Sequence, residues 1–116
     1  MGKIEKFEDI IAWQKSKLLI YNIYKEFRAC KDYAFRDQIQ RASVSIMNNI
    51  AEGYERKGNK EFSKFLYISK GSCGEVRSML YLALDLGYIS KDKFELFSQQ
   101  SLEISRMLSN FIKTLK

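Results

Sequence analysis

The side chains that could carry chemistry in this 116-residue sequence are limited by one absence, because the chain contains no histidine. Histidine is the commonest general base, and it completes the Ser-His and Cys-His nucleophile pairs and many zinc sites. The two cysteines, Cys30 and Cys73, have no second cysteine nearby to complete a metal site. Lys70 and Arg77 on the same helix would lower the pKa of the Cys73 thiol, but a small buried core residue is the favoured interpretation. We therefore expect no metal, no cofactor and no catalysis.

A row of polar residues at helical spacing is the least expected local pattern. Residues three or four apart share one face of a helix, so this row would follow a single face of the segment 35–56. It is either the solvated face of an amphipathic helix or a hydrogen-bonded row at a helix or subunit interface that fixes register. A paired catalytic role for Glu52 and Arg41 is a third hypothesis, which only the presence of these residues supports. The row consists of Gln38, Arg41, Ser45, Asn48, Asn49 and Glu52.

A second pattern is a basic stretch around the connection after residue 56. The chain has a formal net charge of +6, which suits a polyanionic partner. Tyr54 and Tyr67 are interleaved with the basic residues and can stack on bases, although a solvated loop is the alternative. The candidate nucleic-acid-binding residues are Arg41, Arg56, Lys57, Lys60 and Lys64.

Helices must position these side chains, because no segment shows sustained strand-like alternation. The sequence predicts helices over about 8–28, 35–56, 60–86 and 91–115, with no strong break between domains. We expect a single all-α domain over 1–116, folded as an up-down-up-down antiparallel four-helix bundle. Asn59 and Ser90 are predicted as N-caps, and Gly87 as the left-handed residue after the third helix.

The core stripes of two helices are regular. One stripe follows the second helix at three-or-four spacing, and another follows the fourth helix in a three-four alternation that is typical of nearly antiparallel packing. The first is Phe35, Ile39, Ala42, Ile46 and Ile50, and the second is Phe94, Phe97, Ser101, Ile104, Leu108, Phe111 and Leu115.

The other two helices carry less ordinary patterns. The first is apolar on two sides, with Ile11, Leu18 and Tyr21 on one side and Ile23 on the other, so a second subunit is expected to cover one side. The third contains the small-residue run 69–74, in which each of two glycines costs about 1 kcal/mol of helix stability. Close approach of a neighbouring helix would compensate, and a break into two helices is the alternative.

Composition also indicates the cellular compartment in which the protein is expected. Two cysteines are too few for a disulfide framework, and no apolar stretch follows the first six residues, so no signal peptide is expected. The longest apolar run, Met79–Leu84, is far shorter than the roughly 20 residues of a membrane span. We expect a cytoplasmic protein with reduced thiols and no membrane association.

Several successive segments resemble motifs of one family, the four-helix bundle proteins encoded in 23S rRNA intervening sequences. The run 71–75 resembles that family's small-residue turn of the third helix, and 86–89 its loop into the fourth. The other matching segments are Phe7–Lys15, Gln38–Ala42, Ser45–Gly53 and Lys60–Ile68.

The resemblance implies a bundle that assembles into a closed ring, with a homopentamer favoured, and no established enzymatic activity. The family is similar to the accessory variability protein of diversity-generating retroelements, which implies binding to RNA or to a reverse transcriptase. Arg28 and Met47 stand where the family usually has proline, so the end of the first helix is less sharply defined and the second helix less kinked. The motif positions carried over are Gln38, Arg41, Ser45, Asn49, Glu52, Gly53, Glu61, Phe62, Phe65 and Leu66.

The charge pattern, with what the resemblance implies, leads us to expect a non-enzymatic, ring-forming homo-oligomer that binds nucleic acid, RNA in particular. The alternative is an interaction scaffold that binds a polypeptide partner and no nucleic acid, favoured by the doubly apolar first helix and an aromatic content of 14%.

Overall fold

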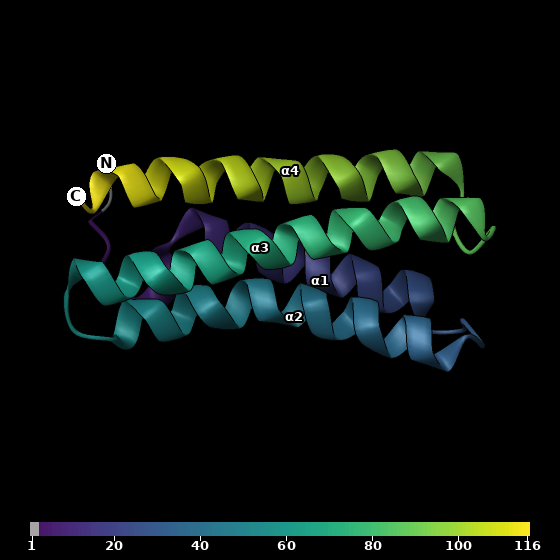
Figure 1. Cartoon of the computed structure of the whole chain (residues 1–116), viewed down its shortest axis with the longest axis horizontal. Helices are drawn as coiled ribbons and strands as arrows, with labels where there is room; N and C mark the ends of the chain where they lie inside the picture. Colours follow the sequence, from purple (N-terminus) through teal and green to yellow (C-terminus); the bar gives the residue numbers. More distant parts are fainter. Residues whose placement is uncertain (1–2) are drawn as a thin grey trace.

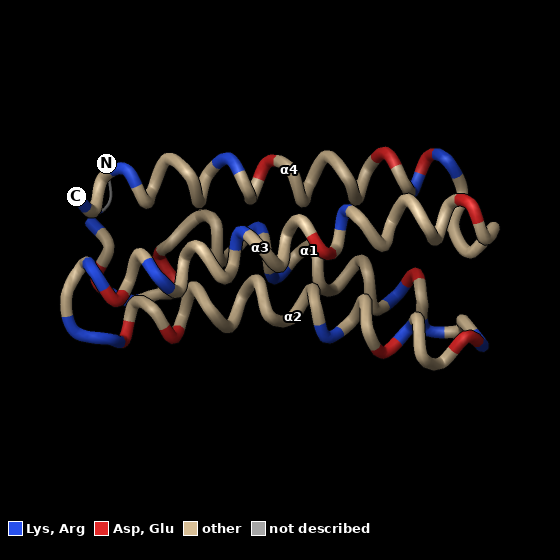
Figure 2. Tube along the Cα trace, viewed as in Figure 1, with Lys and Arg blue, Asp and Glu red and all other residues tan. Residues whose placement is uncertain are grey.

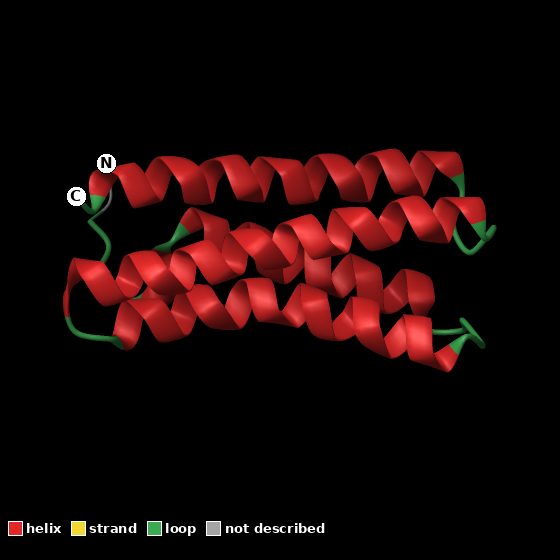
Figure 3. Cartoon of the chain, in the orientation of Figure 1, coloured by secondary structure: helices red, strands yellow, loops and turns green. Residues whose placement is uncertain are grey.

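Four long helices run alternately up and down in the computed structural model, which describes residues 3–116 (Figure 1). A 3-10 turn, η1 (Phe7–Asp9), precedes the first of them. All regular structure within the described residues is helical (Figure 3), which confirms the predicted all-α four-helix bundle. The helices are α1 (Ile11–Phe27), α2 (Tyr33–Glu55), α3 (Gly58–Asp85) and α4 (Lys91–Thr114).

The helix ends follow local hydrogen bonding, and two of the three predicted end residues are confirmed. The Ser90 hydroxyl accepts a hydrogen bond from the Lys93 backbone N–H at 3.2 Å, as an N-cap should. Gly87 follows α3 with φ of 76°, the left-handed conformation expected there. The prediction of Asn59 as an N-cap is wrong, because α3 begins earlier at Gly58, which supplies the turn with φ of 83°.

Two further helices, α1 and α2, also begin elsewhere than their patterns predicted. α1 begins at Ile11 instead of residue 8, because η1 and the extended Ile10 occupy the preceding residues. α2 begins at Tyr33, because a carboxylate oxygen of Asp32 accepts from the Phe35 N–H at 3.1 Å. The second Asp32 oxygen accepts from the Tyr88 hydroxyl at 2.7 Å, which ties the start of α2 to the α3–α4 connection. The hydrogen bonds from Tyr88 and from Phe35 lower the pKa of Asp32.

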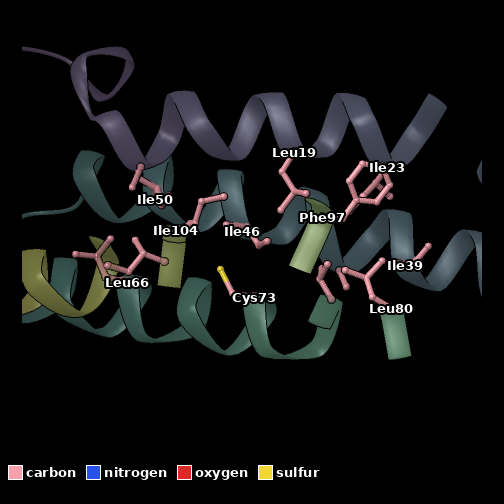
Figure 4. Close-up of a cluster of buried hydrophobic side chains, with 14 of the residues drawn as sticks. Leu19, Ile23, Ile39, Ile46, Ile50, Leu66, Cys73, Leu80, Phe97 and Ile104 are labelled. Atoms are coloured by element: carbon pink, nitrogen blue, oxygen red, sulfur yellow. The ribbon is translucent and has the colours of Figure 1, made fainter. Parts of the chain in front are cut away.

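The core lies along the bundle axis and follows the predicted stripes. All five residues of the α2 stripe are buried, and α4 buries Phe97, Ser101, Ile104 and Leu108, with Ile112 where Phe111 was predicted. Figure 4 shows Ile46, Leu66 and Cys73 among side chains from all four helices. The regular apolar spacing is therefore sufficient to orient α2 and α4.

Small residues set how closely α3 approaches its two neighbours. Gly53 of α2 lies so near α3 that a Cβ added to it would be 2.6 Å from the Cβ of Phe65. Farther along the same contact, the buried Ser69 hydroxyl donates to the Ile46 carbonyl at 2.7 Å. On the other side of α3, the Ser101 hydroxyl of α4 donates to the Cys73 carbonyl at 3.0 Å. These contacts fix the register of α3 against both α2 and α4.

The small-residue run in α3 does not behave as predicted. The helix continues through it without a break, and Ser69 and Cys73 face the core. Gly71 and Gly74 face outward, and an added Cβ would meet no other atom within 4 Å in the described chain. Close approach of a helix of the same chain is therefore not what compensates for these two glycines.

The two apolar sides of α1 are confirmed. Leu19, Ile23 and Phe27 are buried in the core, whereas Leu18 and Tyr21 are 54% and 59% exposed. The bundle therefore covers one side of α1 and leaves the other open.

The close approach at Gly53 generates a test. Replacing Gly53 with Ala should destabilise the fold by about 1–3 kcal/mol, because the new methyl group overlaps a backbone-proximal carbon that cannot easily move. Urea unfolding followed by circular dichroism measures this change. Asn48→Ala, on the exposed face of the same helix, is the control and should alter stability by no more than about 0.5 kcal/mol. Equal stability of the two variants would show that the α2–α3 approach is looser than described.

Candidate nucleic-acid interface

The topology gathers basic residues at one end of the bundle, where the α2–α3 connection meets the end of α4 (Figure 2). An antiparallel bundle brings the end of its fourth helix beside the start of its third, so lysines distant in sequence become neighbours. We call this region the basic end. Its members are Arg56, Lys57, Lys60, Lys64, Lys113 and Lys116.

Two of the predicted binding residues already have acidic partners. Arg56 forms an ion pair with Glu52 at 2.7 Å, and its guanidinium lies 5.0 Å from the centre of the Phe65 ring. Lys64 pairs with Glu61 at 3.3 Å. These exposed pairs are weak, but they reduce the local positive charge. Lys57 and Lys60 have no carboxylate within 4 Å among residues 3–116, so they are the stronger members of the predicted set.

A groove between α3 and α4 adds cations that the sequence prediction missed. Its volume is about 230 Å³, and Lys70, Lys113 and Lys116 lie around it. Within the described chain, no carboxylate lies within 4 Å of these three amines. Tyr67, 60% exposed, forms part of its wall. The sequence did contain a signal for this cluster. Lys113 and Lys116 stand near the end of the predicted fourth helix, and antiparallel packing brings that end beside the third helix.

The two tyrosines proposed to stack on bases differ in access. Tyr54 is half-buried against the core and packs edge-on with Phe62, at 5.9 Å between ring centres. Tyr67 keeps its face open beside the lysine-lined groove. Only Tyr67 is therefore placed to receive a base.

The polar row of α2 divides into two sets. Gln38 donates to Glu75 of α3 at 2.6 Å, and the Ser72 hydroxyl donates to Ser45 at 2.9 Å. Asn49 also donates to Ser45, at 2.9 Å. This set forms a hydrogen-bonded row at the edge of the α2–α3 contact, as one interpretation predicted.

The remaining members of the row, Arg41, Asn48 and Glu52, face solvent, as the other interpretation predicted. Arg41 and Asn48 line a shallow surface depression of about 640 Å³ that also includes Tyr24 of α1. Arg41 precedes Arg56 by about four helical turns, or about 22 Å. The structure therefore does not bring Arg41 into the basic end.

The hypothesis of a catalytic Arg41 and Glu52 pair receives no support from this geometry. Glu52 pairs with Arg56 instead of Arg41, and it does not line the depression that Arg41 borders. Within residues 3–116, no three Cys, Asp or Glu side chains come together as metal ligands would. Cys73 is a core residue, and burial raises the pKa of its thiol to about 12. The thiol therefore stays protonated and is a poor nucleophile.

Comparison with known proteins decides the family. A sequence model described as 23S rRNA-intervening sequence protein matches residues 8–110. The chain belongs to this family. No curated protein matches the chain. None of the helices in residues 3–116 has the length and apolar character needed to cross a bilayer.

A crystal structure of a similar protein has the same fold. It is a protein of unknown function from the S23 ribosomal protein family of Bacteroides thetaiotaomicron, 28% identical, with a TM-score of 0.81. The match covers 88% of the present chain and 98% of the other. The motifs quoted above therefore identified both the family and the architecture correctly.

Thiol labelling tests the assignment of Cys73 to the core. At pH 8 in native buffer, Cys30 should react with an aromatic disulfide reagent at least about 100-fold faster than Cys73, because burial shields the Cys73 thiol and raises its pKa. The variants Cys30→Ser and Cys73→Ser assign each phase, and labelling in denaturant should equalise the rates. Rapid native labelling of Cys73 would contradict the assignment.

Proposed function

We propose that this member of the 23S rRNA-intervening sequence protein family is a non-enzymatic cytoplasmic accessory protein that forms a homo-oligomer and binds nucleic acid, RNA in particular. The observation that carries the proposal is the lysine-lined groove between α3 and α4. It combines Lys70, Lys113 and Lys116 with the open ring of Tyr67. Unpaired amines beside an exposed aromatic ring are the elements that bind single-stranded nucleic acid, through phosphates and base stacking respectively.

Lys57, the N-cap residue of α3, and Lys60, in its first turn, add two cations at the same end of the bundle. Each lysine that contacts a phosphate releases condensed counterions, so binding is driven by positive charge and weakens with salt. The net charge of +6 per chain adds a long-range attraction.

Assembly would strengthen this attraction. A closed ring repeats the basic end once per subunit, and five copies is the number that the resemblance to the family implies. Several subunits can then bind one nucleic-acid molecule. Once the first subunit is bound, the others meet that molecule at a high effective concentration, so the overall affinity exceeds that of a single subunit.

A polypeptide-binding scaffold is the second candidate, and one groove favours it. Ile4, Ile11, Met107 and Phe111 line an open hollow of about 710 Å³ between the N-terminal segment and α4. A hollow of this size can accept apolar side chains of a partner. Purification from the native host with and without nuclease separates the two candidates, since a protein partner survives nuclease and a nucleic acid does not.

The nucleic-acid proposal predicts a specific salt dependence. Binding of a labelled structured RNA with single-stranded loops, measured by fluorescence anisotropy, should weaken linearly on a log–log plot against salt. Five phosphate contacts per subunit correspond to a slope of about −3.5. Reversal of the groove charges with Lys70→Glu, Lys113→Glu and Lys116→Glu should weaken binding at least tenfold near 100 mM salt, a rough estimate on the same basis.

The control makes the same charge change at the opposite end of the bundle, with Lys31→Glu, Lys91→Glu and Lys93→Glu. This variant should bind within about threefold of the natural protein once the common change in net charge is allowed for. Equal losses in both triple variants would place the contact elsewhere. Absence of binding at 50 mM salt would refute the nucleic-acid function.

A further inference from the structure

The groove between α3 and α4 is small, and three lysines share it. Lys70, Lys113 and Lys116 all line a hollow of about 230 Å³. Pockets for drug-sized ligands have volumes of about 300–1,000 Å³, so this one has room for a single nucleotide and not for a longer stretch of a strand. The three cations therefore surround one nucleotide-sized group.

Helical spacing explains why an aromatic ring and the lysines meet at this hollow. Tyr67 and Lys70 stand three residues apart on α3, and Lys113 and Lys116 stand three residues apart on α4, so each pair shares one face of its helix. The side chain of Ile112, 5% exposed, adds an apolar floor. The hollow thus offers a flat apolar surface for a base and positive charge for a phosphate.

Charge distinguishes the kind of phosphate that fits best. A phosphodiester inside a strand carries one negative charge, whereas a terminal phosphate carries about 1.5 to 2 at pH 7. Among residues 3–116, no carboxylate lies within 4 Å of the three lysine amines, so these cations repel one another. A dianion relieves this repulsion more fully than a monoanion does. The hollow therefore favours a phosphate at the end of a strand over one inside it.

The rest of such a strand has a path along α3. Lys60 and Tyr67 are seven residues apart on the helix, so they share a face and are separated by about 10 Å along its axis. Lys57, the N-cap residue, lies about one turn farther toward the hairpin tip. These two lysines are placed to contact the internal phosphates that follow the terminal nucleotide.

We propose that the hollow binds the phosphorylated end of a single-stranded RNA, with the terminal base against Tyr67 and the terminal phosphate among the three lysines. The inference rests on the nucleic-acid function proposed above and names the part of the strand that the site recognises. Unpaired ends are among the parts of RNA whose bases stack readily on aromatic side chains. A 5′ phosphate and a 3′ phosphate share this chemistry, and the experiment distinguishes them.

The test compares three forms of one short unpaired RNA, labelled internally, by fluorescence anisotropy at 100 mM salt. The forms carry a 5′ phosphate, a 3′ phosphate or hydroxyl groups at both ends. One phosphorylated form should bind roughly fivefold or more tightly than the hydroxyl form, because its added charge meets cations that lack a carboxylate partner. Its log–log slope against salt should be steeper by about 0.7 for each additional phosphate charge that is neutralised.

The pH dependence gives a second readout. The sequence contains no histidine, so no side chain has an ordinary pKa between 5.5 and 7.5, and the lysines stay charged throughout this range. The second pKa of a terminal phosphate is about 6, so at pH 5.5 the group approaches the single charge of a phosphodiester. The preference for the phosphorylated end should therefore shrink from pH 7.5 to pH 5.5, while binding of the hydroxyl form stays constant.

Two double variants separate recognition of the end from general attraction. Lys113→Gln with Lys116→Gln should remove the preference, so that the phosphorylated and hydroxyl forms bind alike. Lys57→Gln with Lys60→Gln is the matched control, which removes the same charge at the hairpin tip and should weaken both forms equally. All four side chains are exposed, so both variants should fold, as circular dichroism will check.

The outcomes distinguish this inference from the function on which it rests. Equal binding of all three forms by the natural protein would overturn the inference and leave the nucleic-acid function standing. Loss of the preference in the control variant alone would also overturn it, as would displacement of the RNA by an equal concentration of a free nucleoside monophosphate. Absence of binding by every form at 50 mM salt would refute the proposed function itself.

Discussion

The contact between α2 and α3 is the constraint on which the rest of the molecule depends. It is close because Gly53 has no side chain where Phe65 approaches and because Ser69 satisfies the Ile46 carbonyl within the core. Once this register is set, Gln38 and Ser45 meet partners on α3. The packing of α3 on α4 likewise brings Lys70 of α3 beside Lys113 and Lys116 at the end of the chain. Core packing thus determines which charges meet at the surface.

Much of this architecture could be predicted from the sequence, because apolar spacing carries strong information. The stripe from Phe35 to Ile50 and the seam of α4 are regular enough to orient two helices, and Ser90 and Gly87 set the ends of the α3–α4 connection. The start of α2 was missed although Asp32 is a common N-cap residue three positions before Phe35. What the sequence does not indicate is the second bond that Asp32 accepts, from the distant Tyr88. Local pattern alone cannot contain such a contact.

The candidate site was predictable only in part, for a related reason. Lys57 and Lys60 lie three residues apart at the start of α3 and were found, whereas Lys70, Lys113 and Lys116 become a cluster only after α3 and α4 pack. Charge compensation was equally hidden, since Glu52 lies one turn before Arg56 and could have been assigned to Arg41 instead. A count of cations along the chain therefore overestimates some parts of the surface and misses others.

The lengths of the helices have a consequence for local stability. α1 has 17 residues and α3 has 28, and at the basic end the α2–α3 hairpin extends past the start of α1 (Figure 1). The N-terminal segment, including Ile4, covers this overhang where the rest of the bundle has a fourth helix. Fewer apolar contacts hold the hairpin tip than the middle of the bundle, so local opening there requires less free energy than global unfolding. The hairpin tip that carries Lys57 and Lys60 is thus also the part of the fold that can adjust its shape most readily around a bound polymer.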